Sequence, residues 1–160
     1  MTITPEELRL AMRNWASGIT IVTAEHEGTT HGMTVSSFTS LSLDPPLLSV
    51  SLYNSSRTHA LVSAAGKFGV TILGNGQDEV SNTFAGRVPD EGDRFADCDV
   101  EYLNGKIPFI KGGLSFFECK VHQTVKMGTN TLFIGEIVAS KATEGGEPLI
   151  WFNQKYQSLG

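Results

Sequence analysis

The segment from Gly32 to Leu52 contains two adjacent prolines, and they limit the possible folds more than any other feature of the sequence. Pro45 and Pro46 each fix φ and lack an amide hydrogen, so neither a helix interior nor a central sheet strand can pass through them. The residues on either side alternate between hydroxyl-bearing and apolar side chains, as strands with two different faces do. The segment therefore predicts two extended runs joined by a corner at residues 44–46.

A row of hydroxyl groups follows this otherwise apolar segment. Before the corner one strand parity carries Thr34, Ser36, Ser40 and Ser42, and after it Ser49 and Ser51 share a face. Two interpretations remain open. The hydroxyls either face water and satisfy neighbouring backbone in a β-rich core, or line a cleft whose short donors and acceptors suit a flat polar ligand.

Length and composition predict one soluble globular domain over residues 1–160. The chain is 40% hydrophobic and 18% charged, and no apolar run approaches the ~20 residues of a membrane span. A net charge of −5 without any Lys/Arg block argues against a nucleic-acid surface. The histidines show no metal-ligand spacing, so no metal site is predicted. With no signal-peptide pattern and with Cys98 and Cys119 far apart, we expect a reduced, cytoplasmic protein.

The remaining pattern indicates short helices among many strands. Helices are expected near residues 4–15, 58–65 and 77–85, and the first begins with a capping box at Thr4 and Glu7. Leu8, Met12 and Trp15 recur at helical spacing and give that helix one face to bury. Further strands are expected at residues 19–23, 68–72, 115–125, 131–140 and 149–152, with Tyr156 on a short tail behind the last.

About seven strands without a βαβ rhythm predict a mainly β protein, an antiparallel barrel with a few short peripheral helices. We expect a barrel of this size to bind a ligand at its rim or against a partner subunit. Residues 86–111 are polar and irregular, with a charged run at Asp90, Glu91, Asp93 and Arg94. This composition favours a solvated loop over a mobile lid.

Residues 54–58 end the second central strand and begin the second helix. The first turn of a helix has unpaired amide groups and a positive dipole, which suit a phosphate. Around it the sequence adds hydroxyls and one cation, supplied by Ser55, Ser56, Arg57 and Thr58. Simple N-capping explains the same residues equally well, so both interpretations remain open.

Several short motifs occur in a fixed order along nearly the whole chain, at residues 15–23, 32–40, 43–46, 54–58, 68–70, 84–85, 132–136 and 155–156. Together they resemble the short-chain flavin reductase family. The resemblance implies an antiparallel split β-barrel, usually a homodimer, that binds FMN or FAD. It also implies hydride transfer from NADH or NADPH to the flavin, and a separate partner monooxygenase that uses the reduced flavin.

The resemblance further implies where the flavin lies. The segment matching Met33, Thr34, Val35, Ser36 and Ser37 lies along the flavin ring and ribityl chain. The segment matching residues 51–58 holds the phosphate side, and its candidate contacts are Ser51, Asn54, Ser55, Ser56, Arg57 and Thr58. Phe84, from a further motif, is assigned to the same flavin site.

The turn at residues 128–130 departs from the family pattern. The family often has Gly-Asp-His there, with the histidine helping to seat the nicotinamide, whereas this chain has Gly128-Thr129-Asn130. We predict Asn130, in this turn, and Tyr156, in the last motif, as the catalytic residues. The departure favours one alternative, a flavin-binding or electron-carrier protein on the same barrel without its own nicotinamide turnover. A non-redox binding barrel is a further alternative.

Overall fold

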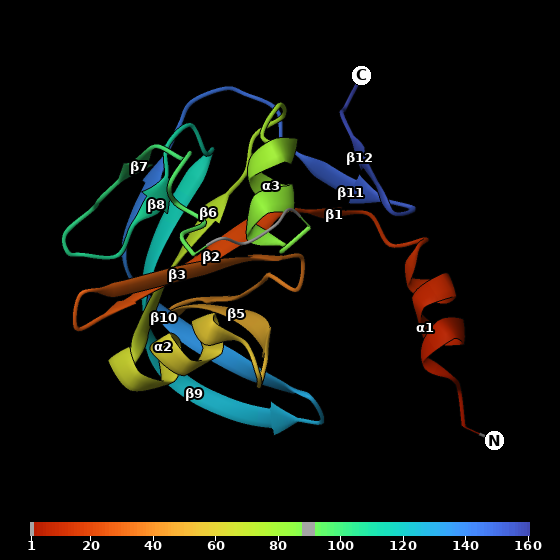
Figure 1. Ribbon diagram of the computed structural model, residues 1–160, viewed down its shortest axis with the longest axis horizontal. Coiled ribbons are helices and arrows are strands. Elements are labelled where there is room, and N and C mark those ends of the chain that lie inside the picture. Colours follow the sequence, from red (N-terminus) through yellow and green to blue (C-terminus); the bar gives the residue numbers. More distant parts are fainter. Residues whose placement is uncertain (1, 88–91) are drawn as a thin grey trace.

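A computed structural model of the chain describes residues 2–87 and 92–160, and it is built around one seven-stranded antiparallel sheet (Figure 1). The strand order is β3-β2-β6-β9-β10-β5-β4. The strands are β2 (Thr20–His26), β3 (Thr29–Val35), β4 (Thr39–Leu43), β5 (Pro46–Tyr53), β6 (Lys67–Ile72), β9 (Ser115–Met127) and β10 (Asn130–Ala142). The predicted mainly β, antiparallel architecture is thus confirmed.

Two small sheets lie beside the large one. The first has the order β1-β11-β12 and contains β1 (Ser17–Gly18), β11 (Ile150–Phe152) and β12 (Lys155–Gln157). The second pairs β7 (Val100–Glu101) with β8 (Phe109–Ile110). Tyr156 therefore lies on β12, and the prediction of a tail at this residue was wrong. The cause is a tight turn at Asn153 and Gln154, both with positive φ, which folds the chain back on β11.

The proline corner forms the turn between β4 and β5, as predicted. Pro46 is the first residue of β5 and pairs with Leu43 at the end of the hairpin, where a missing amide hydrogen interrupts no central ladder. The run before the corner is not one strand, however. β3 ends at Val35, residues 36–38 are irregular, and the register shifts between Ser40 and Ser42. The predicted row of hydroxyls is therefore divided between two strands and the loop that joins them.

The interior of the large sheet is filled by fully buried apolar side chains, among them Val22, Leu48, Val50, Phe68 and Phe133. Gly135 on β10 is needed for this packing. A Cβ there would lie 2.7 Å from the Phe68 ring, so β10 can approach β6 only through a residue without a side chain.

The described residues form three short helices: α1 (Pro5–Met12), α2 (Arg57–Ala65) and α3 (Asp78–Phe84), of which α2 and α3 pack on the sheet. Both hydrogen bonds of the predicted capping box at Thr4 are present. α1 projects away from the sheet (Figure 1) and has no buried residue, so the described part of the chain does not cover the apolar face that the sequence predicts for this helix. Leu8, Met12 and Trp15 are 51%, 54% and 68% exposed. No helix in the described ranges has the length and apolar character that a membrane span requires.

The segment at residues 86–111 is only partly a solvated loop. Ile107, Phe109 and Ile110 are buried, because β8 packs beside β6. The expectation of a solvated loop was therefore wrong for this second half. In the first half, Arg94 donates from Nη1 to the carbonyl oxygens of Gly32 and Phe84. The predicted charged run also includes residues 90 and 91, which lie outside the described residues.

Candidate functional site

The end of β3 separates core side chains from exposed hydroxyls. Met33 packs against the barrel core, and Val35 is buried, with its carbonyl accepting from Thr20 Oγ1 at 2.7 Å. Thr34 has the opposite parity, and its Oγ1 donates to the Ser81 carbonyl at 2.6 Å. Ser36 follows in the irregular loop and is exposed. Hydroxyls are thus available from Thr34 onward, whereas Met33 and Val35 can offer a ligand only backbone groups.

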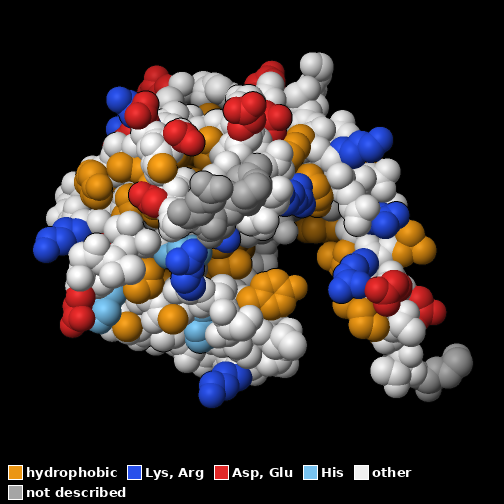
Figure 2. Space-filling view, viewed as in Figure 1, with side chains coloured by type: hydrophobic (Ala, Val, Ile, Leu, Met, Phe, Trp, Pro, Cys, Tyr) orange, Lys and Arg blue, Asp and Glu red, His pale blue; other side chains and the backbone are white. Residues whose placement is uncertain are grey.

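Two adjoining hollows flank this segment and share Ile19 and Ser36. The first has a volume of about 150 Å³, and its other lining residues include Thr34, Arg87, Trp151 and Tyr156. The second has a volume of about 400 Å³ and is lined mainly by residues 15–20 and 36–39. Figure 2 shows the surface hollowed between α1 and the rest of the molecule, with hydrophobic side chains on both sides. Polar and apolar groups therefore line a concave part of the surface, which favours the interpretation that the hydroxyls line a ligand-binding cleft.

Hydrogen bonds connect this segment to Asn130. Ser37 Oγ accepts from the Ser51 amide at 2.9 Å and donates to the Ser51 carbonyl at 3.1 Å. Asn130 Nδ2 donates to Ser51 Oγ at 3.0 Å, and Thr129 Oγ1 donates to Asn130 Oδ1 at 3.1 Å. The turn that departs from the family pattern is therefore fixed against the predicted flavin segment by its own asparagine.

The start of α2 combines an N-cap with an exposed cation. Ser56 is the cap, because its Oγ accepts from the His59 amide at 3.1 Å, so the capping interpretation is confirmed for this residue. Ser55 and Arg57 are exposed. Thr58 is fully buried, and its Oγ1 lies 2.8 Å from His31 Nδ1. Its hydroxyl thus faces the interior, and the structure does not support the predicted contact between Thr58 and a phosphate.

A partly buried chain of polar groups joins α2 to the turn at residues 128–130. Thr131 Oγ1 donates to Asn54 Oδ1 at 2.7 Å and lies 2.9 Å from His59 Nε2. Since the hydroxyl proton points at Asn54, His59 must be the donor to Thr131. Asn54 in turn donates from Nδ2 to the Gly128 carbonyl at 3.1 Å. No sequence motif pointed to His59 or Thr131, although Thr131 has the same strand parity on β10 as the buried Phe133.

Tyr156 lies at the other side of the site. Its phenol donates to Asn82 Oδ1 at 2.6 Å and lies 3.0 Å from Ser81 Oγ, while its ring packs on Trp151 with centroids 5.0 Å apart. Through Ser81 it is connected to Thr34, whereas Asn130 is connected through Ser51 to Ser37. The structure therefore does not bring the two predicted catalytic residues into contact, but joins them to successive parts of one segment.

Phe84 does not line the site. Its side chain is 1% exposed and packs edge-on against Phe95, with ring centroids 5.0 Å apart. A Cβ on Gly32 would lie 3.0 Å from its ring, so Phe84 also fills the space above β3. The structure thus gives Phe84 a core position and does not support its predicted contact with the flavin.

The thiols and the acidic groups of the described residues show no arrangement for nucleophilic or metal chemistry. Burial raises the pKa of Cys119 to about 12, with a smaller effect from the Glu118 carboxylate. Burial also raises the pKa of Cys98, so neither thiol is activated. Across residues 2–87 and 92–160, no three His, Cys, Asp or Glu side chains are grouped closely enough to hold a metal ion. The described polar groups of the site are instead those that orient a ligand.

Comparison with known proteins identifies the class to which this fold and site belong. The model of the flavin reductase like domain matches residues 12–160, and the chain therefore belongs to the flavin reductase family. The resemblance found in the sequence motifs, and the split β-barrel it implied, are confirmed.

Relatives and solved structures agree over most of the chain. The NADH-dependent flavin reductase StyB of Pseudomonas fluorescens is 40% identical, covering 92% of this chain and 86% of its own. The reductase component of 4-hydroxyphenylacetate 3-monooxygenase of Thermus thermophilus is 32% identical, covering 96% of each chain. The structure of flavin reductase PheA2 superposes with a TM-score of 0.90 at 36% identity, covering 99% of each chain.

Proposed function

We propose that the chain is a flavin reductase that transfers hydride from NADH to FMN or FAD and supplies the reduced flavin to a partner monooxygenase. The observation that carries the proposal is the pair of adjoining hollows along Thr34, Ser36 and Ser37, in a chain 40% identical to an NADH-dependent flavin reductase. NADH is preferred over NADPH in the proposal because several relatives are named for NADH. Relatives named as reductase components support the partner monooxygenase.

The residues present fit a flavin mononucleotide unit. Ser36 and Ser37 offer hydroxyl and backbone groups to the polar edge of the ring, and the apolar side chains of the second hollow, Trp15, Ile19 and Phe38, suit its faces. Ser55, Arg57 and the first turn of α2 suit the phosphate, because they combine donors with positive charge. When bound, the flavin supplies the hydride acceptor. The chain's own residues orient the ligands and exclude water.

The decisive experiment mixes the protein anaerobically with FMN or FAD and follows flavin bleaching after NADH or NADPH is added. Rapid, saturable bleaching with NADH is the expected result. A second candidate function, a flavin carrier without nicotinamide turnover, is favoured by Asn130 at the position where the family often has histidine. Tight flavin binding without bleaching would support that carrier and contradict the reductase.

Arg57 tests the phosphate end of this site. Replacing Arg57 by Ala removes a charge-assisted contact worth about 1.5–3 kcal/mol, while Arg57→Lys keeps the charge as a matched control. Because the contact is made equally in ground and transition states, the flavin KM should rise at least about tenfold with little change in kcat. An unchanged flavin KM in folded Arg57→Ala would contradict the proposal that the start of α2 binds the flavin phosphate.

We further propose that the protein is a homodimer in which a second copy covers α1. Leu8, Met12 and Trp15 form an exposed apolar face, and Trp15 also lines the second hollow. A second copy on this face would bury apolar surface and close the open side of the flavin site. Light scattering should give twice the chain mass, and Met12→Lys should shift it toward the monomer. A monomeric wild type that binds flavin tightly would contradict this proposal.

The proposal includes a cytoplasmic location. Both cysteines are free thiols, and a reducing compartment that supplies NADH suits them and the reaction alike. Fractionation of the native host, followed with an antibody, tests this part independently of the activity.

A further inference from the structure

Arg87 closes one end of the first hollow, just beyond the end of α3. Its guanidinium lies over the Trp151 ring, 4.8 Å from the centroid. Nη1 is 3.2 Å from Asn82 Oδ1 and 3.5 Å from the Tyr156 hydroxyl. In the described part of the chain, no carboxylate forms an ion pair with Arg87. The side chain is exposed but held in place by these contacts, which preorganises its guanidinium for an anion.

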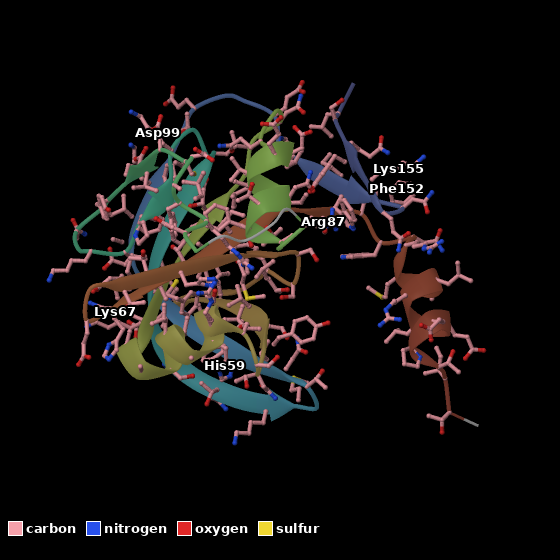
Figure 3. All side chains as sticks on the ribbon, viewed as in Figure 1. His59, Lys67, Arg87, Asp99, Phe152 and Lys155 are labelled. Carbon is pink, nitrogen blue, oxygen red and sulfur yellow. The ribbon has the colours of Figure 1, made fainter. Side chains whose placement is uncertain are left out.

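Arg87 and the proposed phosphate site at α2 lie on opposite sides of β3. His31 and Thr34 have opposite parities on that strand; the first contacts Thr58 of α2, and the second contacts Ser81 of α3. Figure 1 shows α2 and α3 on the two sides of β3, and Figure 3 shows Arg87 and His59 separated in the same way. A single phosphate at the start of α2 therefore does not reach Arg87, which is placed for a different anion.

The hollow beside Arg87 takes only part of a ligand. Its volume is about 150 Å³, whereas whole small-molecule sites have about 300–1,000 Å³. It joins the second hollow at Ser36, so a ligand that lies along the flavin segment can extend into it. One cation, an aromatic ring and the Tyr156 phenol together suit a phosphate attached to an aromatic base. Both polar contacts of Arg87 use Nη1, and a guanidinium has further N–H donors for an anion.

We propose that Arg87, held by Trp151 and Tyr156, binds the phosphate of the adenosine half of a dinucleotide. The inference rests on the proposed function, because it takes the start of α2 as the site of the flavin's own phosphate. FAD and NADH share this adenosine phosphate chemistry, and either can be its source. FMN and reduced nicotinamide mononucleotide lack it, which makes them matched probes.

The test compares Arg87→Met with the wild type, using FMN and FAD as acceptors and NADH and reduced nicotinamide mononucleotide as donors. Met keeps the length of the side chain and removes its charge. We expect the KM for either FAD or NADH to rise by about 10-fold to 100-fold, while the KM for the corresponding mononucleotide stays unchanged. A rise for FAD but not FMN identifies FAD as the source, and a rise for NADH but not the mononucleotide identifies NADH. Arg87→Lys should recover part of the loss.

Lys155→Met is the control, since it removes an exposed cation from the neighbouring β12 and should change none of these constants. Calorimetric titration with FAD, FMN and NAD⁺ repeats the comparison without turnover, so it remains informative if the protein does not reduce flavin. Equal losses for both members of each pair, or no change in any constant, would overturn the assignment of Arg87. Failure of the wild type to bleach flavin would instead contradict the proposed function alone.

Discussion

The polar chain from His59 through Thr131 to Asn54 gives a quantitative prediction for the variant Thr131→Val. Valine has nearly the same shape as threonine and an equal preference for strands, so β10 should keep its geometry. The variant removes the bond that Thr131 donates to Asn54 at 2.7 Å and the bond it accepts from His59 at 2.9 Å. The turn at residues 128–130 loses one of its supports as a result.

The expected loss of stability follows from these two contacts. Each neutral hydrogen bond contributes about 0.5–1.5 kcal/mol net, so Thr131→Val should lower the free energy of unfolding by about 1–3 kcal/mol. The lower part of the range is expected because Asn54 is exposed, so water can replace Thr131 as its partner, although Thr131 itself is only 5% exposed. Thr131→Ser keeps the hydroxyl and should lose less than about 1 kcal/mol.

Urea unfolding measures both variants, with the m-value as a check that the unfolded state is unchanged. If the turn seats the hydride donor, Thr131→Val should also raise the KM for NADH more than the KM for flavin. A Val variant within about 0.5 kcal/mol of the wild type would show that the chain of hydrogen bonds contributes nothing to stability.

Three shorter predictions concern single positions. Asn130→Ala deletes the donor to Ser51 and should reduce kcat/KM for NADH by an amount equivalent to about 0.5–1.5 kcal/mol, without changing flavin affinity. Asn130→His should lower the KM for NADH. Steady-state kinetics measures both variants. Gly135→Ala should cost about 1–3 kcal/mol in urea unfolding, because its Cβ would lie 2.7 Å from the Phe68 ring. Cys119, whose pKa burial raises to about 12, should resist maleimide in the folded protein near neutral pH and react in denaturant, as peptide mapping would show.

The parts of the fold that depend on local patterns were predictable. The capping box at Thr4, the proline corner and the long hairpin of β9 and β10 each follow from residues close together in sequence. The exposure of α1 was not predictable in this way. The apolar spacing of α1 predicted burial, but the pattern contains no information on whether the same chain provides the covering surface.

The site was predictable in its segments and not in the direction of its side chains. Thr34 has the polar parity at the end of β3, Ser36 follows in the loop, and both line the first hollow. Thr58 was predicted from its hydroxyl and from the family motif, and Phe84 from a motif alone. Both turn inward, toward His31 and Phe95 respectively. Burial of this kind depends on how helices pack against β3, which no local pattern specifies.

The pairing of β5 with β10 has a consequence for the newly made chain. Ser51 pairs opposite Leu132, which is synthesised about 80 residues later, so at roughly 5–20 residues per second β5 waits about 4–16 s for its neighbour. During that interval one edge of the strand is open, and open edges are where chains pair with the wrong partner. Cooler expression, which slows such encounters, should therefore raise the soluble yield, and a fragment ending before residue 130 should aggregate.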